Sequence, residues 1–253
     1  MDFIFIIVMG GLWGSFANVC IYRLPQDKGV VSGRSYCPKC KTQISWYDNI
    51  PILSYLLIQG KCRKCKKQIS KQYLVVELLS VLSFVVAYFF YGITVTTLLF
   101  IILALAFIVI FFIDLKHYII PNSITFPLMF LGFVKSFDPN LIELFPNYIN
   151  SLIGGIIGYG IIWVIIFVYK ILRNKEGMGL GDAKLLSAIG FWFGWIAIPF
   201  ILFLSSVIAL LSVIPSLLKN SKTMSSQIPF GPYIIVGTLV YLFFENSFKL
   251  LIF

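Results

Sequence analysis

Long runs of apolar residues alternate with short polar segments along almost the whole chain. Each run approaches the roughly 20 residues that an α-helix needs to cross the hydrocarbon core of a bilayer. The sixth and seventh runs are fused and are divided here at 195–199, so a count of seven spans is an alternative. The pattern predicts eight membrane-spanning helices, near 2–20, 73–92, 94–113, 119–135, 149–170, 183–199, 200–218 and 229–248.

The composition supports an assignment to the membrane. The 253-residue chain is 59% hydrophobic and only 12% charged, whereas soluble domains average about 25% charged residues. A soluble fold of this length cannot bury so much apolar surface. The runs are too long for barrel strands, and lipid offers no partner to a free backbone group. We therefore expect an all-α polytopic membrane protein without an evident internal repeat.

The basic residues predict the orientation of the chain. Eleven of the twenty lysines and arginines lie in residues 23–72, between the first two runs. With eight spans, eighteen of the twenty fall on the side of that segment, and only Lys135 and Lys249 fall on the other. Because basic loops mark the cytoplasmic side, 23–72 is predicted to be a cytoplasmic insertion and both termini to be exterior. The net charge of +10 then follows from topology, and no nucleic-acid partner is expected.

Four of the five cysteines form two CxxC pairs within the insertion, 37-CPKC-40 and 62-CRKC-65. This spacing is typical of a zinc ribbon, in which four thiolates hold a structural Zn²⁺ in a closed tetrahedral site. The thiolates would come from Cys37, Cys40, Cys62 and Cys65, and the neighbouring lysines are expected to lower the thiol pKa. Disulfides or free thiols are the alternatives, and a cytoplasmic location disfavours disulfides. Cys20, in the first run, is expected to be a small buried apolar residue.

Two carboxylates stand where predicted helices meet polar loops on the same side of the membrane. Asp114 closes the third run, and Asp182 opens the sixth, within 177-GMGLGDAKLL-186. Two neighbouring carboxylates cannot both ionise easily, so one can act as a base towards water while the other, protonated, polarises a carbonyl. That is the chemistry of aspartic proteases. Glycines 177, 179 and 181 would permit backbone conformations that are barred to other residues, close to a substrate.

Plainer interpretations of the same residues stay open. Asp182 can cap a helix that starts at the next residue, and Asp114 can be an interfacial residue paired with Lys116. A proton- or cation-coupled transporter that uses the two aspartates as a relay is the main competing function. The glycine pairs at 10–11 and 154–155 fit transporter helix breaks or, more commonly, close helix packing. A third interpretation makes the insertion a docking module on a membrane anchor.

The motifs, taken in order, resemble a known family. They are 14-GSFANVCIYRLP-25, the two CxxC pairs, 114-DLKHYIIPN-122, 179-GLGDAKLL-186 and 229-PFGPYIIVG-237. Over nearly the whole chain this series is similar to the bacterial type IV prepilin peptidases, which are GxGD intramembrane aspartic proteases. The resemblance implies that Asp114 and Asp182 are the catalytic pair and that Gly179, Gly181 and Lys184 support the catalytic loop. It also places 229–237 near the active site, although its prolines and glycine can simply start a helix.

The resemblance also implies what the protein does. Such enzymes remove the short basic leader of prepilins and pseudopilins after a glycine, on the cytoplasmic side of the bacterial inner membrane. The family is often bifunctional and then N-methylates the new amino terminus with S-adenosylmethionine. On this basis 1–92, with the four-cysteine loop 23–72, is the methyltransferase-associated region, and 93–253 is the peptidase region. Glu77 is then assigned to the methyl-transfer site, where its charge would hold the substrate amine or the sulfonium.

Overall fold

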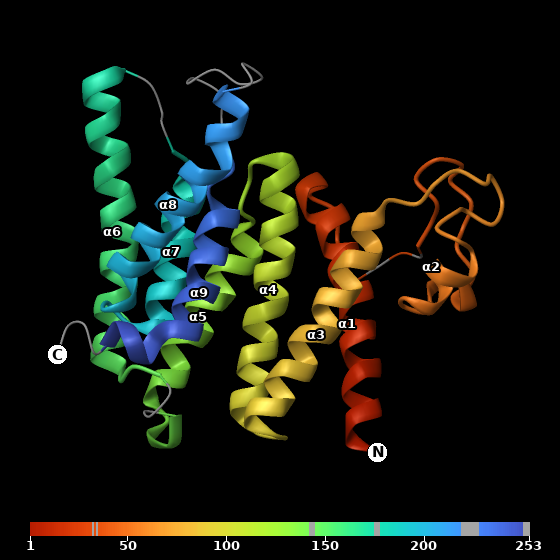
Figure 1. Ribbon diagram of the computed structural model, residues 1–253, viewed down its shortest axis with the longest axis horizontal. Coiled ribbons are helices and arrows are strands. Elements are labelled where there is room, and N and C mark those ends of the chain that lie inside the picture. The colour runs from red at the N-terminus through yellow and green to blue at the C-terminus, as the bar shows by residue number, and fades with distance from the viewer. Residues whose placement is uncertain (32, 34, 142–144, 175–177, 219–227, 250–253) are drawn as a thin grey trace. The chain divides into compact units, whose positions relative to one another are not determined.

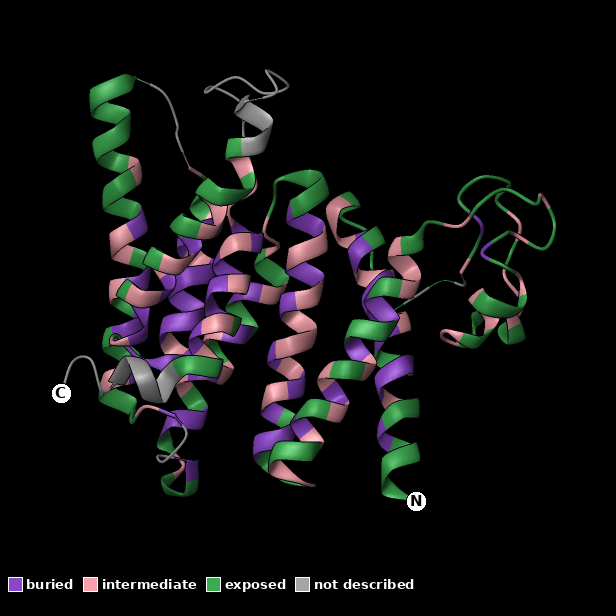
Figure 2. Ribbon diagram, in the orientation of Figure 1, coloured by how far each residue is buried: buried purple, intermediate pink, exposed green. Residues whose placement is uncertain are grey.

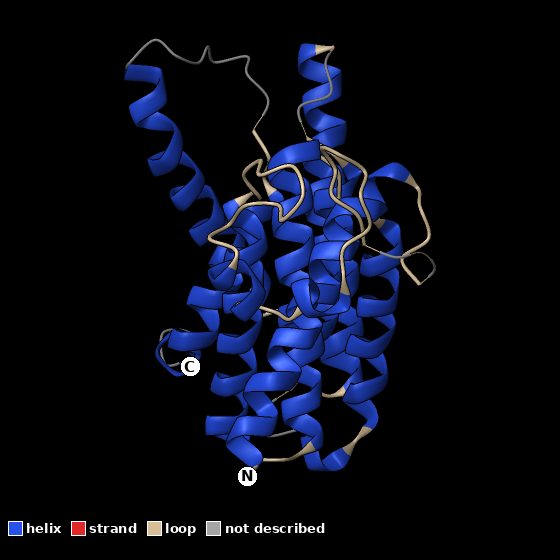
Figure 3. Cartoon of the chain, turned by 90° about the vertical axis from the view of Figure 1, so that its right-hand side faces the viewer, coloured by secondary structure: helices blue, strands red, loops and turns tan. Residues whose placement is uncertain are grey.

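Helices make up almost all of the regular structure in the computed structural model (Figure 1). The structure describes residues 1–253 except 32, 34, 142–144, 175–177, 219–227 and 250–253. The described residues contain helix and loop but no strand (Figure 3), so the expected all-α class is confirmed. The α-helices are α1 (Asp2–Arg23), α2 (Leu53–Leu57), α3 (Lys71–Tyr91), α4 (Val95–His117), α5 (Asn122–Val134), α6 (Tyr148–Arg173), α7 (Leu180–Phe193), α8 (Ala197–Leu218) and α9 (Gly231–Lys249). Short 3-10 helices are η1 (Leu24–Gln26), η2 (Trp46–Asn49), η3 (Lys135–Phe137) and η4 (Pro139–Leu141).

Each predicted apolar run overlaps one of the helices other than α2, but these helices differ in length. Among the described residues, five helices are long and apolar enough to cross a membrane, namely α1, α3, α4, α6 and α8. By contrast, α5 and α7 have 13 and 14 residues, or about 20 Å at 1.5 Å per residue. That is less than the roughly 30 Å of a hydrocarbon core. The structure thus supports a multi-pass membrane protein, with five helices of spanning length among the described residues.

The fused sixth and seventh runs are separated by a real helix break. α7 ends at Phe193 and α8 begins at Ala197. Gly194 lies between them with φ of 79°, a left-handed conformation that L side chains rarely adopt. The break at 194–196 therefore overlaps the predicted division at 195–199 and begins one residue before it.

The chain forms two compact units, Met1–Val109 and Ile110–Phe253. In the first unit, α1 packs closely against α3. A Cβ atom on Gly10 would lie 2.8 Å from the Cα of Val81, and one on Gly14 would lie 2.8 Å from the Cα of Glu77. Small residues allow two helix backbones to approach in this way. Glycines of the first run therefore serve helix packing.

In the second unit, α7 is the most enclosed helix. Ten of its fourteen residues are buried, and in Figure 2 most of α7 has the colour of buried residues. Gly154 of α6 and Gly190 of α7 meet backbone to backbone, and a Cβ atom on Gly158 would lie 2.6 Å from the carbonyl oxygen of Leu186. The glycines at 154–155 thus also serve close helix packing, and the structure favours this interpretation of them over transporter helix breaks. α7 is thereby fixed along its length against α6.

Side chains from the second unit hold the C-terminal end of α7. The Nζ atom of Lys135 donates to the carbonyl oxygen of Trp192 at 3.0 Å and lies 3.6 Å from the centre of the Phe145 ring. The indole of Trp192 in turn donates to the carbonyl oxygen of Leu128 at 2.8 Å. A cation is favoured at this end of a helix by the helix dipole. Lys135 is therefore a buried structural residue, and the opposite end of the helix it holds carries Asp182.

Candidate active site

Asp182 lies in the first turn of α7 and is buried. The helix begins at Leu180 with Gly179 as its N-cap. The Asp182 carboxylate accepts a hydrogen bond from the Gly179 backbone amide. An acidic side chain in the first turn is favoured there because it satisfies a free amide and opposes the positive end of the helix dipole. The capping interpretation is thus partly right, although the helix starts three residues earlier than it assumed.

The glycines before Asp182 are not needed for unusual backbone conformations. Gly179 has φ of −84° and Gly181 lies inside the helix, so the predicted reason for these two glycines is wrong. Instead, a Cβ atom on Gly181 would lie 3.1 Å from the Cβ of Ile120. Gly181 therefore lets the segment after Asp114 pack against the start of α7. Gly177 lies outside the described residues.

Asp114 lies in the last turn of α4 with its side chain 4% exposed. Its Oδ2 atom accepts a hydrogen bond from the backbone amide of Gly231, with N and O 3.0 Å apart. Lys116 is exposed, and no ion pair joins it to Asp114 in the described part of the chain. The proposed pairing of Asp114 with Lys116 is therefore wrong. Asp114 is instead held by a backbone group at the start of α9.

Gly231 is the functional residue that sequence reasoning missed. The resemblance places its segment, 229–237, near the active site, but no role was predicted for Gly231 itself. A Cβ atom on Gly231 would lie 2.7 Å from Asp114 Oδ2. Its φ is not left-handed, so the turn itself does not require glycine. The requirement comes from the close approach of the carboxylate to the backbone.

The structure brings the two predicted aspartates together. Asp114 and Asp182 are both buried, and their carboxylates interact electrostatically. Repulsion between two like charges in a weakly solvated site favours a state in which the pair shares one proton. Each carboxylate also accepts a backbone amide, from Gly231 and Gly179 respectively, which orients it. The arrangement can hold a water between a base and an acid.

Lys184 links the two segments that carry the aspartates. Its Nζ atom donates to Oδ1 of Asn122 at 2.8 Å and lies 5.5 Å from the centre of the Phe126 ring. Asn122 is the first residue of α5 and closes the motif that begins with Asp114. The contact therefore fixes the N-terminal half of α7 to the segment after α4.

The four cysteines of the CxxC pairs form one cluster in the first unit. The Sγ atoms of Cys37, Cys40, Cys62 and Cys65 all lie within 4.8 Å of one another. Sulfur atoms around a tetrahedral Zn²⁺ stand about 3.8 Å apart, given Zn–S bonds of about 2.3 Å. Cys20 lies on α1, apart from this cluster. The cluster can hold a metal ion through four thiolates.

The two cysteine knuckles have the same backbone construction. The amide of Cys37 donates to the carbonyl of Thr42 at 2.9 Å, and the amide of Cys62 donates to the carbonyl of Lys67 at the same distance. Lys41 and Lys66, each just after a second cysteine, both have left-handed φ. The segments 36-YCPKCKTQIS-45 and 61-KCRKCKKQIS-70 are thus a short internal repeat, which corrects the expectation of none. A repeated knuckle supplies two thiolates from each half.

Hydrogen bonds, rather than lysine charges, shift the thiol pKa values in this cluster. The side chain and backbone of Thr42 lower the pKa of Cys40 to about 6. Backbone amides of its own knuckle lower the pKa of Cys62. The amide of Lys67 lowers the pKa of Cys65, but burial and the other three thiols together raise it to about 11. A metal ion would replace the thiol protons that these groups share.

Glu77 is buried on α3 in the first unit, at 8% exposure. Its Oε2 atom accepts a hydrogen bond from the backbone amide of Ile52, with N and O 2.7 Å apart. Glu77 and the cysteine cluster therefore belong to the first unit. The aspartate pair, Gly179, Gly181 and Lys184 belong to the second.

Comparisons with known proteins point in one direction. Residues 8–91 match the family model of the bacterial peptidase A24 N-terminal domain, and residues 101–214 match that of the type IV leader peptidase family. A prepilin leader peptidase/N-methyltransferase from Aeromonas hydrophila is 35% identical over 258 residues, covering 92% of this chain and 88% of the relative. Proteins of the same name from Vibrio cholerae and Pseudomonas aeruginosa are 36% and 34% identical, covering 96% and 95% of this chain and 98% and 90% of the relatives. No match is found among solved structures. This chain therefore belongs to the type IV leader peptidase family.

Proposed function

We propose that this protein is a membrane-embedded aspartic endopeptidase that removes the basic leader of type IV prepilins and pseudopilins after a glycine. It then N-methylates the new amino terminus. Family membership and the names of the relatives support both activities. The observation that carries the peptidase proposal is the buried, interacting pair of Asp114 and Asp182. None of the relatives named above is a transporter.

The proposed mechanism gives each aspartate a role in hydrolysis. The pair holds one proton between its two carboxylates. The ionised member takes a proton from a water molecule, whose oxygen then attacks the scissile carbonyl carbon. The protonated member donates to the carbonyl oxygen, and collapse of the tetrahedral intermediate returns a proton to the departing amine. Gly231 and Gly179 keep both carboxylates in place through their backbone amides.

The substrate must leave helical geometry before it can be cut. A helix engages each interior carbonyl in a hydrogen bond to the amide four residues later. The scissile bond therefore has to be extended at the site. Gly179 is uncrowded, because the nearest atom to a Cβ placed there is Asp182 Oδ2 at 3.8 Å. An extended substrate backbone can thus approach the carboxylate at this point.

The proposed topology has eight spans in the inner membrane of a bacterium. The five helices of spanning length support a multi-pass chain, and α5, α7 and α9 would be the shorter crossings. The density of basic residues in 23–72 supports a cytoplasmic insertion between the first two spans, with the active site facing the cytoplasm. Prepilins and the lipid bilayer are then the partners.

The cysteine cluster and Glu77 belong to the proposed methyltransferase region, 1–92. Zn²⁺ is the ion that a closed set of four thiolates best fits, and such a site has a structural role. S-adenosylmethionine supplies the methyl group when it is bound. Glu77 is the acidic residue proposed for the methyl-transfer site, and its buried position on α3 supports that role. Residues 93–253 form the proposed peptidase region.

One experiment tests both activities. The purified protein is incubated with a prepilin that carries its leader, with and without S-adenosylmethionine, and the products are weighed by mass spectrometry. A loss of the leader mass by the wild type, absent in Asp182→Asn and Asp114→Asn, supports the peptidase. An added methyl mass only with the methyl donor supports the transferase. If the folded wild type leaves the prepilin intact, the aspartates return to the ion-relay interpretation.

A further inference from the structure

The buried carboxylate of Glu77 has a neutral partner. Its Oε2 atom accepts the amide of Ile52 at 2.7 Å, and its other oxygen accepts no hydrogen bond from any residue that the structure describes. No lysine or arginine within the described ranges pairs with it. A buried charge is costly unless a counter-charge or several hydrogen bonds compensate it. The carboxylate of Glu77 is therefore suited to bind a cation, and none of the described residues supplies that cation.

The amide that Glu77 accepts comes from a strained turn. The amide of Leu53 donates to the carbonyl of Pro51 at 2.6 Å, which closes a three-residue γ-turn around Ile52. Ile52 has φ of 61° and ψ of −56°, which is the rare form of this turn. A β-branched residue at positive φ is an outlier that surrounding structure must maintain. The hydrogen bond to the Glu77 carboxylate therefore comes from a turn whose backbone is strained at Ile52.

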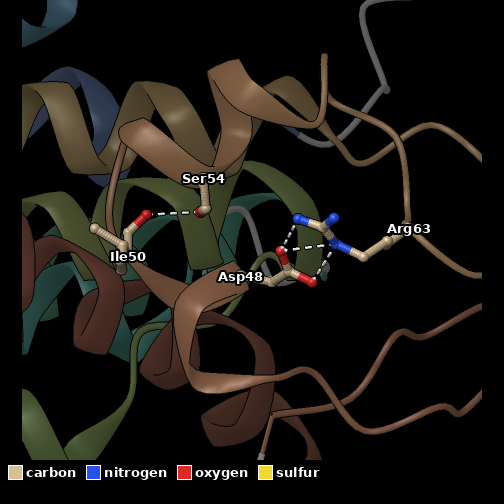
Figure 4. A network of polar contacts seen from close by, with 4 residues as sticks. All are labelled: Asp48, Ile50, Ser54 and Arg63. Carbon is tan, nitrogen blue, oxygen red and sulfur yellow. Dashed lines mark hydrogen bonds and ion pairs between the residues drawn. The ribbon is translucent and has the colours of Figure 1, made fainter.

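Contacts on both sides hold this turn in place (Figure 4). The hydroxyl of Ser54 donates to the carbonyl of Ile50 at 2.6 Å across the turn. Just before it, Asp48 accepts hydrogen bonds from the guanidinium of Arg63, at 2.8 to 3.1 Å. Arg63 lies in the second cysteine knuckle, so the turn is tied to the cysteine cluster.

A second unpartnered acceptor lies along the same seam between α1 and α3. The side-chain amide of Asn18 donates to the carbonyl of Tyr73 at 3.0 Å, but its Oδ1 atom is buried without a partner. Gly14 packs against Glu77, and Asn18 and Tyr73 lie four residues from Gly14 and Glu77 on their respective helices. Residues four apart are about one helical turn, or roughly 5.4 Å, from each other along a helix. The seam thus carries an anionic acceptor and a neutral acceptor about one turn apart.

We propose that Glu77, with the side-chain oxygen of Asn18, binds the primary ammonium group of the newly exposed amino terminus, and that the Pro51–Ile52 turn leaves Glu77 when it binds. An ammonium group has three donors and makes a charge-assisted bond stronger than that of a neutral amide. Release of the strain at Ile52 assists the exchange. This inference rests on the proposed N-methyltransferase activity, because the ligand is the acceptor of that reaction. In the free protein the amide of the turn thus takes the position on Glu77 that the substrate amine takes when it binds.

Hydrogen–deuterium exchange in the full-length protein, in lipid nanodiscs, tests the exchange of partners. The probe is a peptide with the sequence of a mature pilin amino terminus, starting with phenylalanine, with a free amine or N-acetylated. The free-amine peptide is expected to speed exchange of the Ile52 amide at least tenfold, and the acetylated peptide to leave it unchanged. Equal exchange with and without saturating free-amine peptide overturns the proposal.

Two variants separate this role from a purely structural one. Glu77→Gln keeps an oxygen that can accept the Ile52 amide but removes the charge, so the fold should persist while KM for the acceptor peptide rises at least tenfold. Ile52→Gly keeps the amide and removes the strain, so the turn is harder to displace and KM rises severalfold with kcat unchanged. Gln59→Gly is the matched control, since Gln59 has φ of 51° in the same loop, whereas the backbone hydrogen bond to Glu77 comes from Ile52. A wild-type KM in Glu77→Gln overturns the proposal.

Failure of the inference and failure of the proposed activity look different. Methylation with unchanged hydrogen exchange at Ile52 overturns only the proposed displacement of the turn by the amine. Leader cleavage without any methylation, together with unchanged exchange at Ile52, overturns both the second activity and the amine site.

Discussion

Replacing Gly231 with alanine tests whether its backbone amide sets the catalytic geometry. The new Cβ would lie 2.7 Å from Oδ2 of Asp114, closer than real Cβ contacts allow, so the carboxylate or the start of α9 must move. Either movement breaks the hydrogen bond between the Gly231 amide and Asp114. A hydrogen bond to a charged group contributes about 1.5–3 kcal/mol. If that energy is lost at the transition state, kcat/KM for leader cleavage falls about 10- to 150-fold.

The assay is the initial rate of leader removal from a purified prepilin, followed by mass spectrometry. Gly237→Ala is the matched control, because it lies on the same helix and its Cβ would lie 2.5 Å from Oγ of Ser205, away from the aspartates. Gly231→Ala should lose cleavage far more than Gly237→Ala while keeping its methyltransferase rate and thermal stability. Alanine has a better helix propensity than glycine, so helix formation does not explain a loss. A cleavage rate within twofold of wild type would refute the role assigned to Gly231.

Three further changes probe other contacts. Lys184→Met removes the 2.8 Å hydrogen bond from the lysine ammonium to Asn122. Because this bond is exposed to solvent, its charge adds little, and we take the ordinary contribution of about 0.5–1.5 kcal/mol, so that cleavage kcat/KM should fall about two- to tenfold. An unchanged initial rate would contradict the link. Cys40→Ser, or treatment with a chelator, should remove bound zinc, as measured by elemental analysis, and should speed hydrogen exchange in 23–72. Either change should lower the rate of methylation more than the rate of cleavage. Loss of cleavage with methylation intact would contradict the proposed division of the chain. Gly190→Ala forces α6 and α7 apart and should lower the melting temperature and abolish cleavage, whereas Gly160→Ala, which enters open space, should change neither.

The helices and the nearness of the two aspartates could be predicted from the sequence for physical reasons. A bilayer requires long apolar runs, so each run overlaps a helix even where its ends differ by several residues. The basic residues place the ends of the third and sixth runs on one side of the membrane, which is why Asp114 and Asp182 were expected near each other. The cysteine cluster was accessible because metal ligation imposes a characteristic spacing.

The contacts that position these groups could not be predicted from the sequence, because they depend on tertiary packing. Gly231 meets Asp114 across 117 residues of sequence, and no periodicity signals that approach. The reason for Gly181 depends on Ile120, which the sequence places in another helix segment. The same holds for Ile52, whose amide reaches Glu77 from a loop.

The short length and enclosure of α7 have a consequence for how the enzyme responds to its membrane. α7 is only about 21 Å long and mostly buried, whereas α6, with 26 residues, is about 39 Å long and has many exposed apolar side chains. Acyl chains therefore press on α6 rather than on the helix that carries Asp182. Hydrophobic mismatch tilts long outer helices. Because α7 is fixed along its length against α6, it tilts together with α6, and the contacts around Asp182 are kept. The cleavage rate should then vary little between thin and thick bilayers, such as those a bacterium makes as it adjusts its lipids to temperature.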